Sequence, residues 1–309
     1  MLNSEELEKL RKAGRIAANA RELGMSMVKE GVKYYDVAEE VEGYIKSHGC
    51  KLAFPCNISV NHYAAHYTPS YNDRNVFEIG DVVKVDCGAH VDGFVGDTAG
   101  TVEVGTKNFK TLIESAKAAR DAAMEIIGEG CPLNKIGEAV NYQIASRGFS
   151  PIRNLSGHQI EPYNLHAGLC IPNYDDGDEQ KITAGIVLAC EPFATNGEGI
   201  IVGKKFGNIY KMLNEKELAE QRHSPIRDPR LRDYYNYLIE EFSTFPFCAR
   251  HCEDPKAATI NLTKLMHLGY VTAYAICEER KGGCVSQFEH TVYIGGKKGE
   301  ITTICDGGY

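Results

Sequence analysis

The stretch at residues 82–104, VVKVDCGAHVDGFVGDTAGTVEV, contains two largely apolar strand-like segments, and each of them includes one aspartate, Asp86 or Asp97. Its β-branched residues favour strands, and the central Asp92-Gly93 pair is a strong signal for a two-residue hairpin turn. We therefore expect Asp86 and Asp97 to lie on opposite arms of one hairpin and to face each other. Two buried carboxylates that close together need a cation between them to stay ionised. The pattern is compatible with a divalent metal site, but for the hairpin alone one solvent-facing acid and one strand-end acid is the simpler interpretation.

Further acids and imidazoles occur later in the chain, in apolar or turn-flanked segments. They are His158 in SGHQI, Glu191 in ACEPF and Glu289 in SQFEHT, with His66 and His166 in similar settings. Taken singly, each is more typical of a strand end or of a hydrogen-bonded histidine. Several carboxylates and an imidazole converging on one face would instead suit two divalent ions, which can activate a water molecule for hydrolysis.

The elements that must position these residues form two similar halves. Helices are expected at 4–30, 35–48, 108–129 and 133–147, and strands near 52–61, 182–195, 270–277 and 285–294. The helix pairs match at an offset of 99 positions, as in Arg21 with Arg120 and Gly49 with Gly148. This repeat predicts an α+β fold with a pseudo-two-fold axis, in which two helix pairs cover a curved antiparallel sheet.

The segment 203–270 interrupts the pattern of the two halves. It is charged, contains four prolines and shows helical stretches near 214–222, 228–242 and 255–268. We expect an inserted helical subdomain at 203–270, and a main domain formed by residues 1–202 and 271–309.

Composition excludes several classes of function. A net charge of −8 argues against direct nucleic-acid binding, and no apolar run is long enough to cross a membrane. The N-terminus enters a helix directly, with Asn3 and Glu6 as a capping pair, and lacks the pattern of a signal peptide. Eleven cysteines without a CxxC pair fit a reducing cytoplasm, and CARHC at 248–252 matches no zinc-finger spacing. We expect a cytoplasmic monomer.

Six motifs in a fixed order carry a family resemblance over essentially the whole chain. They are AAHYTP at 64–69, VDCGAHVDGFVGDTA at 85–99, SGHQI at 156–160, LHAG at 165–168, ACEPFATNG at 189–197 and SQFEHT at 286–291. With these motifs the chain resembles the type II methionine aminopeptidases, a group of the pita-bread metallohydrolases. The insertion at 203–270 and the internal repeat agree with that resemblance.

The resemblance implies a role for each motif residue. The metal ligands would be Asp86, Asp97, His158, Glu191 and Glu289, with Asp97 and Glu289 bridging two divalent ions of Co, Mn, Fe or Zn. His66 and His166 would contact the substrate and stabilise its reacting centre, and Glu191 would move the proton of the attacking water. Phe54, Phe193 and, on a looser motif, Tyr274 would line a pocket for the methionine side chain.

The implied reaction is removal of the N-terminal methionine from nascent polypeptides whose second residue is small, with the ribosome as one place to meet them. Two alternatives remain open. Prolidases and aminopeptidase P share the fold and the metals, but they usually carry an additional N-terminal domain. A non-catalytic relative would use the same fold to bind protein or RNA, but such relatives have lost metal ligands that all stand in this sequence.

Overall fold

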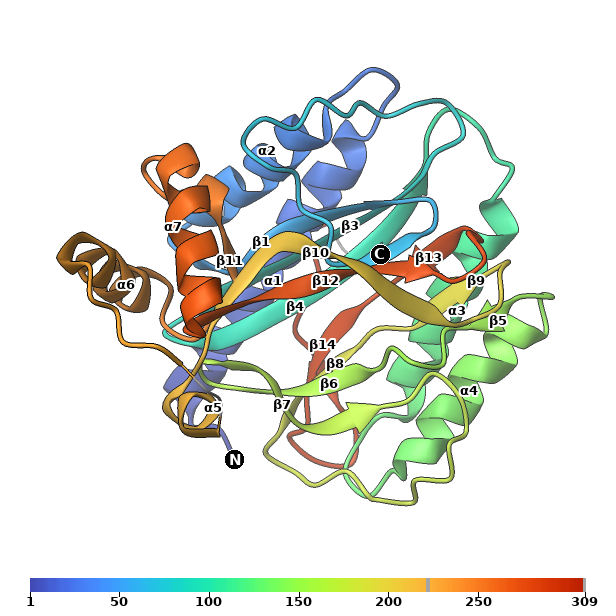
Figure 1. Cartoon of the computed structure of the whole chain (residues 1–309). Helices are drawn as coiled ribbons and strands as arrows, with labels where there is room; N and C mark the ends of the chain where they lie inside the picture. The colour runs from blue at the N-terminus through green and yellow to red at the C-terminus, as the bar shows by residue number, and fades with distance from the viewer. Residues whose placement is uncertain (221–222, 308–309) are drawn as a thin grey trace.

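The computed structural model describes residues 1–220 and 223–307, and its helices lie around the outside of a set of antiparallel strands (Figure 1). Every pairing between the described strands is antiparallel. The strands form four hydrogen-bonded groups, with the orders β1-β3-β4, β11-β10-β12-β2, β13-β9-β5 and β15-β14-β8-β6-β7. Among the described residues, no helix is both long and apolar enough to span a bilayer.

The first half packs helices α1 (Ser4–Met27) and α2 (Tyr34–Ser47) against strands β1 (Lys51–Val60), β3 (Val82–Val91) and β4 (Phe94–Glu103). The predicted capping box is confirmed, because Asn3 and Glu6 each accept the other's backbone N–H. Helix α1 lies very close to β4. A Cβ atom on Gly96 would lie 2.3 Å from the Gly14 Cα atom, so only glycine allows this approach.

The second half repeats this plan with helices α3 (Lys110–Ile126) and α4 (Leu133–Ala145). Helix α4 begins 99 residues after α2 begins, which confirms the predicted repeat. Each helix pair has its own buried cluster of apolar side chains beneath it. The strands of this half are β5 (Ser150–Pro151), β6 (Gly157–Glu161), β7 (Asn164–Ile171), β8 (Val187–Cys190), β9 (Phe193–Thr195), β13 (Val285–Gln287), β14 (His290–Tyr293) and β15 (Glu300–Ile301).

A third group of strands joins β10 (Ile201–Met212) to β12 (Val271–Glu279), β2 (Tyr63–Ala65) and β11 (Phe247–Cys248). Residues 203–212, which we counted with the helical insertion, therefore lie in a strand. The helices of the insertion come between β10 and β12, and α6 and α7 stand at the left edge of Figure 1. They are α5 (Glu215–Glu220), α6 (Pro229–Phe242), the 3₁₀ turn η1 (Ala249–His251) and α7 (Pro255–Leu268).

The hairpin of β3 and β4 is confirmed, but its register corrects one expectation. Asp92 and Gly93 both have positive φ angles, 49° and 87°, as a tight two-residue turn requires. This turn places Asp86 opposite Ala99 and Asp97 opposite Gly88. The two aspartates therefore do not face each other directly. They lie on the same face of the hairpin as diagonal neighbours, because residues two apart on a strand point the same way.

Two long strands expected from the sequence are each broken at a glutamate. The predicted strand 182–195 divides into β8 and β9 around Glu191, and the predicted strand 285–294 divides into β13 and β14 before His290, at Glu289. At both breaks the chain passes between the β13-β9-β5 group and the β15-β14-β8-β6-β7 group. An apolar run does not reveal such a break, because the residues on both sides of it remain buried.

Candidate metal centre and substrate pocket

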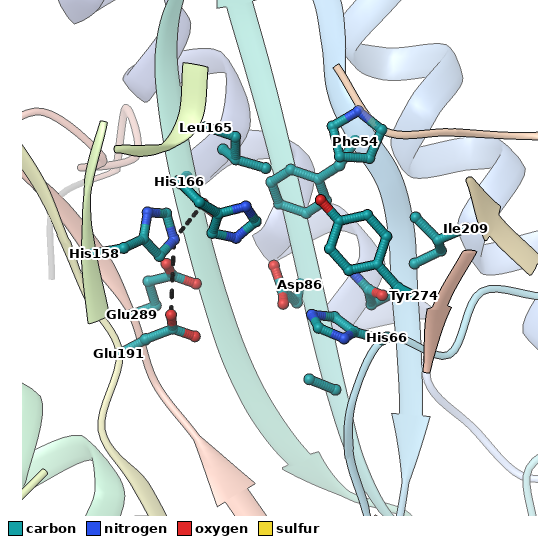
Figure 2. Close-up of a pocket in the computed structure, with 14 residues that line it drawn as sticks. Phe54, His66, Asp86, His158, Leu165, His166, Glu191, Ile209, Tyr274 and Glu289 are labelled. Atoms are coloured by element: carbon teal, nitrogen blue, oxygen red, sulfur yellow. Dashed lines mark ion pairs between the residues drawn. The ribbon is translucent and has the colours of Figure 1, made fainter. Parts of the chain in front are cut away.

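Five acidic and imidazole side chains converge on one pocket. Asp86 and Asp97 come from the hairpin, His158 from β6, and Glu191 and Glu289 from the two strand breaks. Figure 2 shows His158, Glu191 and Glu289 together on one side of the pocket, with Asp86 at its centre. The sequence analysis named these five residues as one set, and the structure brings all of them to the same pocket.

Short distances mark the tightest part of this cluster. His158 Nε2 lies 3.7 Å from Asp97 Oδ2 and 3.7 Å from Glu191 Oε1. One ligand atom each of Asp97, His158 and Glu289 lies within 4.8 Å of the others. These separations allow one cation to contact three side chains that are distant in the sequence.

The cluster is electrostatically unfavourable without a cation. Burial raises the pKa of Asp86 to about 7. Burial, together with the neighbouring carboxyl groups, raises the pKa values of Asp97, Glu191 and Glu289 well above their usual range. Burial lowers the pKa of His158 to about 4, so its imidazole is neutral and can act as a metal ligand.

Unsatisfied polar atoms point to the same conclusion. Within the described part of the chain, Asp86 Oδ1 and Asp97 Oδ1 are buried and have no hydrogen-bond partner. The Gln287 amide lies 3.5 Å from Asp86 Oδ2 and 3.3 Å from Glu191 Oε2, and so contacts carboxylates from both halves of the molecule. Buried polar atoms normally have partners, and a donor set of carboxylates with one imidazole fits a divalent cation of the Mn, Fe, Co or Zn type.

His66 lies on the opposite side of the pocket in a strained conformation (Figure 2). Its φ angle of 63° is uncommon for a residue other than glycine, and such strain is typical of functional sites. His66 Nδ1 lies 3.2 Å from the carbonyl oxygen of Ala275. Because a carbonyl can only accept, Nδ1 carries the proton of the neutral ring and Nε2 keeps its lone pair. Burial lowers the pKa of His66, which favours this neutral form.

His166 lies at the exposed mouth of the pocket, between the metal cluster and Tyr274. Its ring centroid is 4.5 Å from that of His158 and 6.2 Å from that of Tyr274. The Tyr274 ring also meets the His66 ring edge-on at 5.1 Å. The two histidines therefore flank the space next to the metal cluster.

The remaining walls of the pocket are largely apolar. Phe54, Leu165, Ile209 and Pro246 line it, and the space in front of these walls, including its open mouth, measures about 470 Å³. Phe54 pairs with Gly88, which stands between Asp86 and His90 on the same face of the hairpin. A Cβ atom on Gly88 would lie 2.3 Å from Phe54 Cε1, so this glycine makes room for the phenyl ring.

Phe193 lies elsewhere than the sequence analysis expected. Its side chain is 1% exposed and packs in a cluster with Ala64, Ala65 and Val285, and it is not among the described residues that line the pocket.

Several residues of the site were missed from the sequence. Gln287 and Leu165 stand inside the SQFEHT and LHAG motifs, beside residues that we did select. Ile209 and Pro246 belong to the segment 203–270, where no motif drew attention to them.

Comparisons with known proteins extend over nearly the whole chain. Residues 8–294 match metallopeptidase family M24. A curated methionine aminopeptidase of Methanocaldococcus jannaschii is 40% identical over 302 residues, which cover 97% of this chain and 99% of that protein.

Solved structures show the same pita-bread fold. A methionine aminopeptidase from Thermotoga maritima matches with a TM-score of 0.69 at 24% identity, covering 98% of both chains. A prolidase from Pyrococcus furiosus matches with a TM-score of 0.61 at 20% identity, covering 97% of this chain but 64% of the prolidase. The match over residues 8–294 and the full-length relative together show that this chain belongs to metallopeptidase family M24.

Proposed function

We propose that this chain is a metal-dependent methionyl aminopeptidase that removes the N-terminal methionine from polypeptides whose second residue is small. The observation that carries the proposal is the meeting of five ligand-type side chains at one end of an apolar pocket. The 40% identical methionine aminopeptidase, which the chain covers almost completely, supports the same reaction.

The residues proposed to hold two divalent cations are Asp86, Asp97, His158, Glu191 and Glu289. Of these, Asp97, His158 and Glu289 already place one ligand atom each within 4.8 Å of the others, and Asp86 and Glu191 would complete the set. When bound there, divalent cations of Co, Mn, Fe or Zn would neutralise the buried carboxylates and would increase the acidity of water for attack on the first peptide bond.

The two flanking histidines have different tasks in this proposal. His66 donates its Nδ1 proton to the Ala275 carbonyl, so its Nε2 atom can accept a hydrogen bond from the N–H of the scissile peptide. His166, on the other side, donates to the carbonyl oxygen as negative charge develops there. Glu191 lies beside both His158 and the Gln287 amide, where its carboxylate can take the proton of the attacking water and return it to the leaving amine.

Specificity for methionine follows from the pocket walls. Phe54, Leu165, Ile209, Pro246 and Tyr274 present a largely apolar surface to an unbranched thioether side chain. A flexible thioether fills an irregular apolar pocket well, whereas a charged side chain would lose its hydration there.

The setting of the reaction is part of the proposal. The substrates are the N-termini of nascent polypeptides. The enzyme acts on them in the cytoplasm, including at the ribosome, and works as a monomer. None of the eleven cysteines forms a disulfide in the described part of the chain and seven of them are buried, which fits a reducing compartment. Residues 1–202 and 271–309 form the catalytic domain in this proposal, and 203–270 are the insertion typical of the type II group.

Release of methionine from Met-Ala-Ser and Met-Gly-Met-Met tests the proposal. The purified protein is treated with a chelator and then assayed with added Mn²⁺, Co²⁺, Fe²⁺ or Zn²⁺ in turn. We expect no turnover after chelation and recovery with at least one metal. Turnover of Xaa-Pro substrates alone would assign the chain a prolidase-type activity, and no turnover with any metal would favour a binding protein.

A further inference from the structure

The two halves of the molecule meet where strand β4 crosses the segment 287–291. Strand β4 carries Asp97 and belongs to the β1-β3-β4 group, whereas Glu289 lies between strands of two other groups. At the centre of the crossing, the Glu289 N–H donates to the Ala99 carbonyl at 3.0 Å. The carboxylates of Asp97 and Glu289 therefore approach each other across a junction between separate sheets.

Threonine hydroxyl groups take the place of backbone hydrogen bonds on both sides of this central contact. Thr291 Oγ1 accepts from the Asp97 N–H at 2.7 Å and donates to the Asp97 carbonyl at 2.8 Å. Thr101 Oγ1 accepts from the Gln287 N–H at 2.9 Å and donates to the Gln287 carbonyl at 2.7 Å. Both threonines are buried, so water cannot replace these bonds easily.

A third hydroxyl connects the crossing to helix α1. Thr98 Oγ1 donates to the Glu289 carbonyl at 2.9 Å and accepts from Arg21 Nη1 at 2.5 Å. The Arg21 residue is 4% exposed, which makes it a buried support behind the junction. Each of the two carboxylate residues at the crossing thus has its main chain held by a threonine of the other half.

We propose that Thr291 is a positioning residue that holds the backbone of Asp97 in register with that of Glu289, and so sets how the two carboxylates share metal ions. The inference rests on the proposed metal centre. Its physical basis is that one hydroxyl bonds both the N–H and the C=O of Asp97, which restricts rotation of the backbone on both sides of its Cα atom. Metal ligands must be held to within about 0.5 Å of their productive geometry, so this restriction acts directly on metal affinity.

The test compares three variants at Thr291 with a matched control. Thr291→Val keeps the shape but removes both hydrogen bonds, Thr291→Ser keeps the hydroxyl, and Thr291→Cys offers a weak donor and acceptor. The control is Thr195→Val. Thr195 is equally buried, donates to the Cys284 carbonyl at 2.8 Å and accepts from the Gly197 N–H at 2.9 Å, and it does not line the pocket.

Titration calorimetry of the chelator-treated full chain with Mn²⁺ gives affinity and stoichiometry without reference to activity. We expect Thr291→Val to weaken Mn²⁺ binding about 10- to 100-fold, as supporting hydrogen-bond partners of metal ligands do. Thr291→Ser should remain within about threefold of the unmodified chain, and Thr291→Cys should lie between the two. Thr195→Val should lower the melting temperature about as much as Thr291→Val, with unchanged Mn²⁺ affinity.

If Thr291→Val binds Mn²⁺ as tightly as the unmodified chain, the inference is wrong. It is also wrong if Thr195→Val loses as much Mn²⁺ affinity as Thr291→Val, because the loss would then reflect a general loosening of the fold. If Thr291→Val does not fold, Thr291→Cys decides: Mn²⁺ affinity equal to that of Thr291→Ser contradicts the proposal. If the unmodified chain itself does not bind Mn²⁺, the result contradicts the proposed function and not the role of Thr291.

Discussion

Replacing Glu42 by glutamine should destabilise the fold by roughly 3–5 kcal/mol, because it breaks a buried ion pair and leaves a charge behind. Glu42 accepts from Arg250 Nη1 at 2.6 Å and Nη2 at 2.8 Å, and its Oε2 lies 2.9 Å from His251 Nε2. The three side chains are between 2% and 5% exposed. The network joins helix α2 to the turn η1, so it attaches the helical segment to the main domain.

The same network makes stability depend on pH. Burial lowers the pKa of His251, but the Glu42 carboxylate outweighs burial and raises it from 6.5 to about 9. A folded-state pKa above the unfolded value stabilises the fold fully below pH 6.5, and this contribution is lost as the pH rises to 9. At about 1.4 kcal/mol per pKa unit, the contribution is about 3 kcal/mol.

Urea unfolding from pH 6 to pH 9.5, at constant metal concentration, measures both effects. The cost of Glu42→Gln should be largest at pH 6 and smaller at pH 9.5, where His251 is mostly neutral in the unmodified chain. Glu39→Gln is the matched control, because Glu39 also bonds Arg250 Nη1 at 2.6 Å but is 45% exposed. Its removal should cost less than about 1 kcal/mol. Equal costs for the two variants, or a cost for Glu42→Gln that does not change with pH, would refute this reasoning.

Three further substitutions test the site. Gly88→Ala should displace the Phe54 ring, because the new Cβ atom would lie 2.3 Å from Phe54 Cε1. We expect it to raise KM for Met-Ala-Ser more than it lowers kcat. An unchanged KM would show that Phe54 does not contribute to substrate binding. Asp97→Ala should remove both activity and bound metal, which elemental analysis can measure, and a variant that keeps most of its activity would exclude Asp97 from the ligands. His66→Asn tolerates the positive φ angle and should lower kcat about 100-fold at unchanged metal content, whereas metal loss would make His66 a ligand.

Local chemistry in the sequence was sufficient for several features of the fold. The Asp92-Gly93 turn, the Asn3 capping box and the 99-residue repeat depend on neighbours in the chain or on internal similarity, and all three were predicted correctly. Four of the six motifs contain the five acidic and imidazole side chains that meet in the pocket.

Tertiary contacts decided the rest, because they join residues about 200 positions apart and leave no periodic pattern. Ile209 and Pro246 reach the pocket from a segment that carries no motif, and Phe193 turns into the core. The CARHC segment at 248–252 matched no zinc-finger spacing, yet it supplies the arginine and histidine that bind Glu42.

The hairpin of β3 and β4 illustrates the difference between what the sequence determines and what tertiary contacts determine. Residue types alone placed Asp86 and Asp97 on opposite arms, but the pairing register made them diagonal rather than opposed. Strand alternation repeats every two residues, so it determines which face a side chain occupies but not which partner it meets. The two-residue turn at Asp92-Gly93 fixes that partner, so the diagonal placement follows from the sequence once the pairs are counted outward from the turn. Only the tertiary structure brings His158, Glu191 and Glu289 to the same pocket, because they come from separate strands far along the chain.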